Sequence, residues 1–110
     1  MKLILKDKII ELEIANTFFK RFKGFMFQFS TIQTGIVFPK TRSIHTFFMF
    51  QPIDVIMTDK NQKILYMWES LNSENIILPK KNVYYTYELP INSINGLQLG
   101  DILNIEKTKK

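Results

Sequence analysis

Alternating apolar and polar residues recur along most of the chain and predict a mainly β fold. Residues 10–14 alternate three aliphatic side chains with two glutamates, a spacing typical of a strand that buries one face. The polar residues 6–8 predict a hairpin turn between this strand and a first strand at 3–5. The same alternation, or a short apolar run, predicts further strands at 36–38, 44–50, 53–58, 64–68, 83–89 and 102–106.

One segment, from Thr17 to Phe29, has helical rather than strand spacing. Its apolar side chains recur at helical intervals, and they are Phe18, Phe19, Phe22, Phe25, Met26 and Phe29. Most polar residues fall on the opposite side, and Asn16 or Thr17 can cap the first turn. The spacing therefore predicts one amphipathic helix near the N-terminus, with its phenylalanine stripe in the core.

Together these elements amount to about seven or eight short strands and one helix, a series typical of a compact β-barrel or β-sandwich. The predicted fold class is mainly β, with α+β at the margin. The polar stretch 69–82 is predicted to be a long surface loop, and 91–95 one helical turn. The length of 110 residues fits a single domain over 1–110, with a disordered tail from about residue 107.

Composition narrows the class of protein. Cysteine is absent, which excludes a disulfide framework, a thiolate zinc site and a cysteine nucleophile. The N-terminal residues lack the long apolar run of a secretory signal, and no stretch approaches the roughly 20 apolar residues of a membrane span. These features predict a cytoplasmic protein without a membrane span.

The net charge of +5 favours contact with anionic partners. The basic residues are scattered along the sequence, which is typical of ordinary solvated surface. The alternative is an anion-binding face, whose candidate binding residues are Lys20, Arg21 and Lys23 on the predicted helix and Arg42 beyond it.

Three residues are candidates for acid–base chemistry: His45, Asp54 and Glu88. His45 is the only histidine and lies in an apolar strand-like run, so a hydrogen-bonded core role competes with catalysis or metal ligation. For Asp54, a structural carboxylate that accepts backbone N–H bonds at a turn is favoured over a functional one. Glu88 falls on a face that is either solvent or a groove. If the three converged, they would form an acid–base pair or a two-carboxylate, one-histidine metal site; their spacing does not require this, and no metal is predicted.

The order of several short motifs resembles the family called domain of unknown function 192. These motifs are RFKGFM, GIVF, SIHTFFM, PIDVIMTD, YELP and GLQLGD, at 21–26, 35–38, 43–49, 52–59, 87–90 and 96–101. The resemblance spans about residues 15–105 and implies a compact, mainly β domain from a bacterium or archaeon, with no established reaction or cofactor. The motif positions are His45, Met49, Asp54, Glu88, Gly96, Gly100 and Asp101. Relatives often have a cysteine near the position of Thr41, so its absence here speaks against a thiol-based role.

The favoured function is a binding or accessory module without catalysis or cofactor, whose partner is an anionic ligand or a protein. A first alternative is a small hydrolase or metal-dependent enzyme that uses His45 with Asp54, Glu88 or both. A second alternative is a weak binder of nucleic acid or anionic surfaces. The arrangement of the three candidate residues in space discriminates the enzyme from the binding module.

Overall fold

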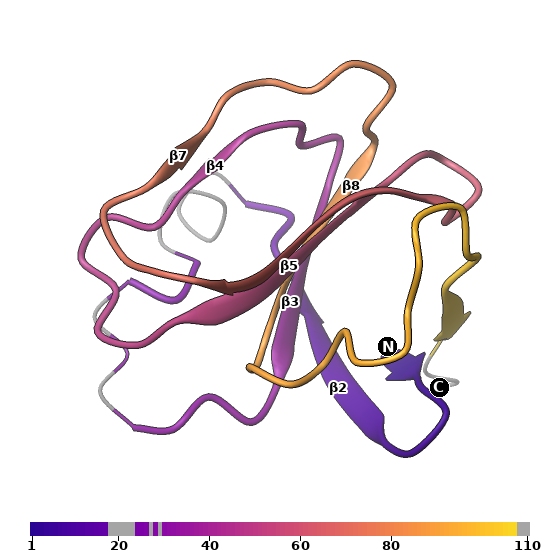
Figure 1. Cartoon of the computed structure of the whole chain (residues 1–110), viewed down its shortest axis with the longest axis horizontal. Coiled ribbons are helices and arrows are strands. Elements are labelled where there is room, and N and C mark those ends of the chain that lie inside the picture. The colour runs from indigo at the N-terminus through magenta and orange to yellow at the C-terminus, as the bar shows by residue number, and fades with distance from the viewer. Residues whose placement is uncertain (18–23, 27, 29, 108–110) are drawn as a thin grey trace.

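The structure, a computed structural model, describes residues 1–17, 24–26, 28 and 30–107, and strands dominate this part of the chain (Figure 1). The strands are β1 (Lys2–Ile4), β2 (Ile9–Ile14), β3 (Gly35–Pro39), β4 (Ile44–His45), β5 (Ile53–Thr58), β6 (Ile64–Leu71), β7 (Ile76–Ile77), β8 (Tyr85–Leu89) and β9 (Asn104–Glu106).

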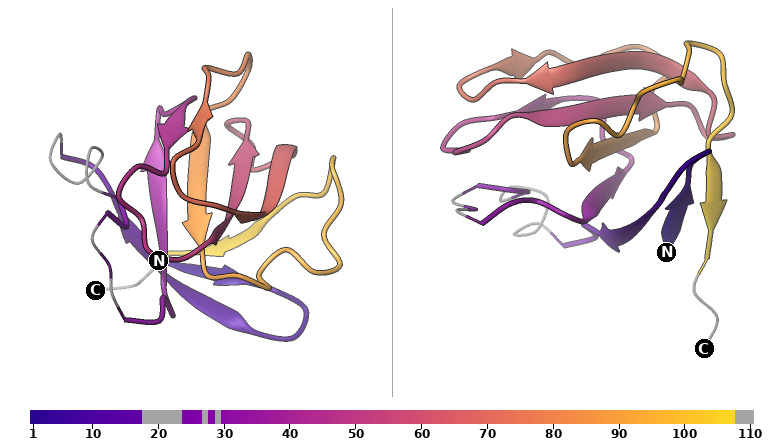
Figure 2. Two further views of the ribbon diagram at one scale, coloured as in Figure 1. Left: turned by 60° about the vertical axis from the view of Figure 1, so that its left-hand side comes forward. Right: turned by 60° about the horizontal axis from the view of Figure 1, so that its bottom comes forward.

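Seven of the described strands form one sheet in the order β6-β5-β8-β3-β2-β1-β9, while β4 and β7 pair separately. Neighbours in the large sheet are antiparallel except β2 and β3, which run parallel. Figure 2 shows from two sides that this sheet is curled rather than flat. The sheet is therefore a half-barrel with a concave and a convex face.

Backbone hydrogen bonds draw the two edges of the half-barrel toward each other. The segment 100–103 precedes the edge strand β9 and bonds to the start of the other edge strand, β6. The N–H of Gly100 donates to the carbonyl of Ile64 at 2.9 Å, and the N–H of Leu103 donates to the carbonyl of Gln62 at 2.9 Å. These bonds leave a hollow between the closing segment and the concave face.

Two hydrophobic clusters occupy the two faces of the sheet, because side chains alternate between faces along each strand. The ribbon-side cluster, on the face toward β4 and β7, comprises Ala15, Phe25, Ile32, Ile36, Phe38, Met49, Ile53, Val55, Met57, Ile77 and Val83. The hollow-side cluster comprises Leu3, Ile10, Leu12, Val37, Ile56, Ile64, Tyr87, Leu89, Ile94 and Leu103. All of β5 is buried, since it contributes to both clusters.

The mainly β prediction is confirmed, but the predicted helix over 17–29 is wrong for the residues that the structure describes. Residues 24–26 form a turn, and Gly24 has φ +50°, a left-handed value that a right-handed helix does not accommodate. The N–H of Gln28 donates to the carbonyl of Phe25 at 3.2 Å, which is a turn bond rather than a helical one. The rest of the predicted helix, 18–23 with 27 and 29, lies outside the described residues, and no described residue is helical.

Three further predictions also need correction. The strand predicted over 44–50 ends at His45, because the chain turns there and the N–H of Met49 donates to the carbonyl of Thr46. The stretch 69–82 is not one loop, since β6 continues to Leu71 and β7 follows. Its polar residues suggested a loop, but β6 is an edge strand of the sheet, where polar side chains can face solvent. Residues 91–95 form turns without a helix. The tail beyond Lys107 lies outside the described residues.

No helix in the part of the chain that the structure describes is long and apolar enough to cross a membrane.

A substitution at Gly35 tests how tightly the centre of the sheet is packed. A Cβ atom at this position would lie 2.7 Å from a methyl carbon of Leu89 and 2.8 Å from one of Leu12. We expect Gly35→Ala to lower the free energy of unfolding by about 1–3 kcal/mol through overpacking, measured by urea denaturation. The exposed neighbour Thr34, changed to Ala, is the control. An unchanged midpoint for Gly35→Ala would contradict this packing.

Candidate functional site

Asp54 lies on β5 and is fully buried on the concave side of the sheet. Its carboxylate accepts three backbone N–H bonds: from Ser70 at 2.9 Å, from Ser93 at 2.8 Å and from Ile94 at 3.2 Å. Oxygens that already accept from fixed amides have little capacity left for a substrate or a metal. Asp54 therefore connects β5, β6 and the turn after β8.

Glu88 lies on β8 and is buried at 3% exposure. On the neighbouring strands it faces Ile36 and Val55, two apolar partners that supply no hydrogen bond. The turn at Gly24 lies directly over the carboxyl group, because a Cβ at Gly24 would come within 2.9 Å of Oε1. Burial raises the pKa of Glu88 from 4.5 to about 8, although a hydrogen bond from the Phe25 backbone lowers it. Oε1 is a buried atom without a hydrogen-bond partner among the residues that the structure describes. With a pKa of about 8, the group is largely protonated at neutral pH.

Asp54 and Glu88 lie on opposite faces of the same sheet. In the antiparallel pairing of β5 with β8, Asp54 is opposite Leu89 and Val55 is opposite Glu88. Directly paired residues point to the same face. Asp54 therefore lies on the face of the hollow-side cluster, with Leu89, and Glu88 lies on the face of the ribbon-side cluster, with Val55. The sheet itself separates the two carboxyl groups.

His45 lies on β4, on the outer side of the two-stranded ribbon. Its partner across the ribbon is Ile76, which is exposed, whereas the neighbouring pair of Ile44 and Ile77 packs against the core. The Nδ1 atom of His45 accepts from the N–H of Phe47 at 3.3 Å, and the two rings lie 5.2 Å apart. His45 thus lies apart from both carboxyl groups, and no group of three described His, Cys, Asp or Glu residues could hold a metal ion.

The predicted anion-binding face is only partly described. Lys20, Arg21 and Lys23 lie outside the described residues. Arg42 is exposed and lines an open basin of about 440 Å³ together with Lys60 and Tyr84. The ammonium group of Lys60 lies 5.5 Å from the centre of the Tyr84 ring.

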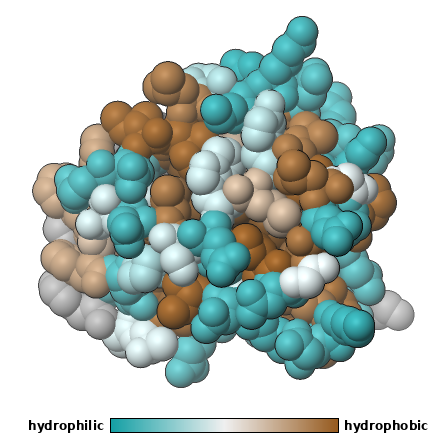
Figure 3. Space-filling view, viewed as in Figure 1, coloured by the Kyte–Doolittle hydropathy of each residue, from teal (hydrophilic) through white to brown (hydrophobic). Residues whose placement is uncertain are grey.

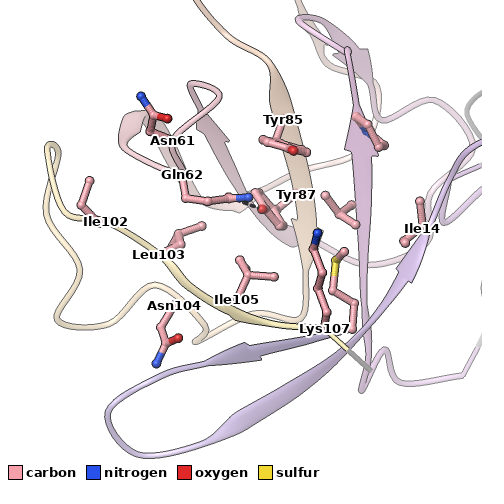
Figure 4. A pocket seen from close by; sticks show the side chains of 13 residues that line it. Ile14, Asn61, Gln62, Tyr85, Tyr87, Ile102, Leu103, Asn104, Ile105 and Lys107 are labelled. Atoms are coloured by element: carbon pink, nitrogen blue, oxygen red, sulfur yellow. Dashed lines mark hydrogen bonds between the residues drawn. The ribbon is translucent and has the colours of Figure 1, made fainter. Parts of the chain in front are cut away.

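A pocket that sequence analysis missed lies in the hollow of the half-barrel (Figure 4). It has a volume of about 350 Å³, within the usual size range of small-molecule sites. Its walls come from β2, β3, β8, the turn before β6, and the closing segment with β9. The lining residues are Met1, Ile14, Val37, Pro39, Asn61, Gln62, Tyr85, Tyr87, Ile102, Leu103, Asn104, Ile105 and Lys107.

Hydrogen-bond donors rather than acids supply the polarity of this pocket. The phenol of Tyr87 donates to Oε1 of Gln62, which leaves the amide nitrogen of Gln62 to donate elsewhere. Burial raises the pKa of Tyr87 above its usual value, so the phenol stays protonated. Lys107 contributes an ammonium group to the lining, and no described aspartate or glutamate lines the walls. The pocket therefore suits an anionic rather than a cationic group.

The sequence contained one signal for this pocket. Tyr85 and Tyr87 alternate along one face of the strand predicted at 83–89, and tyrosines combine apolar area with a polar tip. The remaining wall comes from distant segments that only the fold brings together.

Comparison with known proteins gives a family but no activity. The sequence profile of DUF192, a family described as "Uncharacterized ACR", matches residues 2–105. UPF0127 proteins of Thermococcus gammatolerans and Thermococcus sibiricus are 32% and 35% identical, over 89% and 86% of this chain. The matches span 68% and 65% of those proteins, about two thirds of their length. A UPF0127 protein of Pyrococcus furiosus is 34% identical over 89% of each chain. These three relatives are archaeal, so of the two sources expected from the resemblance they support the archaeal one and not the bacterial one.

Two solved structures have the same fold. A protein of unknown function from Novosphingobium aromaticivorans has a TM-score of 0.78 at 16% identity, with 94% of this chain and 82% of that chain covered. A protein from Sinorhizobium meliloti described as a putative transcription regulator has a TM-score of 0.76 at 21% identity, covering 94% and 89%. At these identities the likeness concerns the fold alone.

Replacing Asp54 by Asn tests its structural role. Asn keeps the size but offers one acceptor oxygen, and its amide N–H₂ would face backbone N–H donors. We expect the free energy of unfolding to fall by roughly 2–4 kcal/mol, since buried donors lose their partners. Chemical denaturation measures the loss, with the exposed Asp7→Asn as the control. A loss of unfolding free energy within about 0.5 kcal/mol, the range of ordinary surface substitutions, would contradict the structural role of Asp54.

The raised pKa of Glu88 predicts that the free energy of unfolding depends on pH. Because the pKa of Glu88 is about 8 in the folded chain and ordinary in the unfolded chain, the folded state binds more protons between about pH 4.5 and 8. Stability is therefore fully present below this window and is lost as pH rises through it, by at most about 1.4 kcal/mol per pH unit. Glu88→Gln should remove this slope and raise the melting temperature at pH 8. The exposed Glu69→Gln is the control, and a slope unchanged in Glu88→Gln would contradict the assignment.

Proposed function

The chain belongs to the DUF192 family, and we propose that it is a binding module that holds a small organic anion in the hollow of its half-barrel. The observation that carries this proposal is the pocket of about 350 Å³, which has mainly apolar walls, hydrogen-bond donors and no acidic side chain from the part of the chain that the structure describes. A molecule that combines an apolar body with a carboxylate matches this chemistry best.

The apolar part of the ligand has a defined place in this proposal. The aliphatic lining residues include Val37, Leu103 and Ile105, and the aromatic ones are Tyr85 and Tyr87. The two tyrosine rings are tilted by 38° with their centres 6.3 Å apart. Tyr87 is fully buried and Tyr85 is half-buried, so the ring of Tyr85 presents the accessible flat apolar area. Burial of an aromatic or aliphatic body against these walls would supply most of the binding free energy.

The anionic part of the ligand is matched by donors on two sides. The amide nitrogen of Gln62 and the ammonium group of Lys107 both belong to the pocket lining. A hydrogen bond from a charged donor to a carboxylate is about twice as strong as a neutral one. Fixing Gln62 through the phenol of Tyr87 reduces the entropy that its side chain would lose on binding.

The separation of His45, Asp54 and Glu88 supports binding rather than acid–base catalysis. An acid–base pair needs its members within hydrogen-bond reach of one substrate, and the sheet lies between the two carboxyl groups. None of the three residues lines the pocket.

Titration with matched probes tests the proposed function. We expect phenylacetate and octanoate to bind, and phenylacetamide, which lacks the charge, to bind at least tenfold more weakly. Isothermal titration calorimetry gives the affinities, and NMR shifts at Tyr85 and Tyr87 locate the site. Lys107→Gln should weaken the binding of phenylacetate about tenfold without changing the affinity for phenylacetamide. The exposed Lys81→Gln should change neither affinity. Equal affinity for phenylacetate and phenylacetamide would rule the proposal out. NMR shifts that leave the signals of Tyr85 and Tyr87 unchanged would also rule it out.

A further inference from the structure

A second surface, separate from the pocket, exposes large apolar side chains on the β4–β7 ribbon, defined here as residues 40–50 and 72–81. Ile77 packs into the ribbon-side cluster, and its neighbours in the alternating chain point the other way. Ile76 is 59% exposed and Leu78 is 68% exposed. Figure 3 shows apolar side chains gathered over the region where β4 and β7 lie. Clustered apolar exposure of this kind marks interaction surfaces more often than scattered single residues do.

Phe48 adds to this surface at a conformational cost. It is 55% exposed and has φ +61°, a left-handed value that is an outlier for a bulky residue. A conformation of this kind persists only when the surrounding structure determines it. The N–H of Phe48 donates to the carboxylate of Glu74 at 3.0 Å, so the facing loop fixes its backbone.

Thr46 connects the same two loops beneath Phe48. Its hydroxyl donates to the carbonyl of Asn72 at 2.8 Å and accepts from the N–H of Asn75 at 2.9 Å. Thr46 is 1% exposed, so this network lies beneath the surface rather than on it. The ribbon is thus a rigid base that presents apolar side chains outward.

The charge of the ribbon is strongly positive. It carries Lys40, Arg42, Lys80 and Lys81 against one acid, Glu74, whose carboxylate accepts the Phe48 N–H. The N–H of Lys80 donates to the carbonyl of Arg42 at 3.1 Å, which brings the two halves of the basic end together. Among the described residues the one ion pair is Lys2 with Glu11, so no described acid forms an ion pair with the basic residues of the ribbon.

We propose that the β4–β7 ribbon docks the protein on an anionic lipid bilayer. Phe48, Ile76 and Leu78 enter the headgroup region, while Lys40, Arg42 and Lys81 contact lipid phosphates and carboxylates. The ammonium group of Lys80 lies 5.6 Å from the centre of the Tyr66 ring, so Lys80 adds to the positive charge of the ribbon rather than to these contacts. Apolar insertion and electrostatic attraction together are what peripheral membrane binding requires, because either alone is weak. A second copy of the chain fits less well, since the basic residues would face each other.

Vesicle sedimentation tests the proposal with the full chain. Vesicles of phosphatidylcholine with 30% phosphatidylglycerol should bind the protein at least tenfold more strongly than pure phosphatidylcholine, and 0.5 M NaCl should remove most of this difference. Equal partitioning into both vesicle types, or no binding to either, would overturn the proposal.

Matched variants separate docking from misfolding. Phe48→Asn combined with Leu78→Ser should lower vesicle binding at least tenfold, and Asn is well tolerated at a left-handed φ, so the melting temperature should not fall. Leu99→Ser, at 64% exposure outside the ribbon, is the control and should bind as the unmodified chain does. Unchanged vesicle binding by the double variant would overturn the proposal, as would self-association in solution that the double variant abolishes, because a second copy would then cover the ribbon.

Discussion

The buried carboxylate of Asp54 is the interaction on which the remaining architecture depends. A charged group without water is stable only when hydrogen bonds replace its hydration, and Asp54 obtains them from the backbones of Ser70, Ser93 and Ile94. Meeting this requirement fixes the end of β6 and the turn after β8 relative to β5. That turn leads into the segment that closes over the hollow, so one side chain in the core sets the position of a wall of the pocket.

Local pattern predicted the strands and the hairpin of β1 with β2, but not how strands distant in the sequence pair. The alternation at 10–14 and 83–89 and the apolar run at 53–58 correspond to β2, β8 and β5, because their periodicity is contained in the segment itself. The helix predicted over 17–29 had an equally clear period, yet the positive φ at Gly24 breaks it at the point where the chain turns over Glu88. Spacing alone carries no information on that tertiary contact.

For the candidate site residues, too, sequence predicted the local role but not the long-range arrangement. For Asp54 the favoured interpretation from sequence was an acceptor of backbone N–H bonds, and its three backbone donors have this geometry. Whether Asp54 and Glu88 share a face depends on the register of β5 against β8, which joins strands far apart in the sequence and pairs Asp54 with Leu89. The pocket depends on still more distant segments, from Met1 to Lys107. Neither arrangement follows from any local pattern, which is why sequence analysis missed the pocket.

The pairing of β9 with β1 has a consequence for how the protein folds. Lys2 lies opposite Glu106 and Ile4 opposite Asn104, so nearly the whole described chain separates these partners. Closing a loop of that length costs entropy before the contact contributes any stability. The β5–β6 hairpin can form early from local contacts, whereas we expect the wall built by β9 to form late. The hollow is thus a late product of folding, and the most readily opened part of the molecule is expected to be this wall.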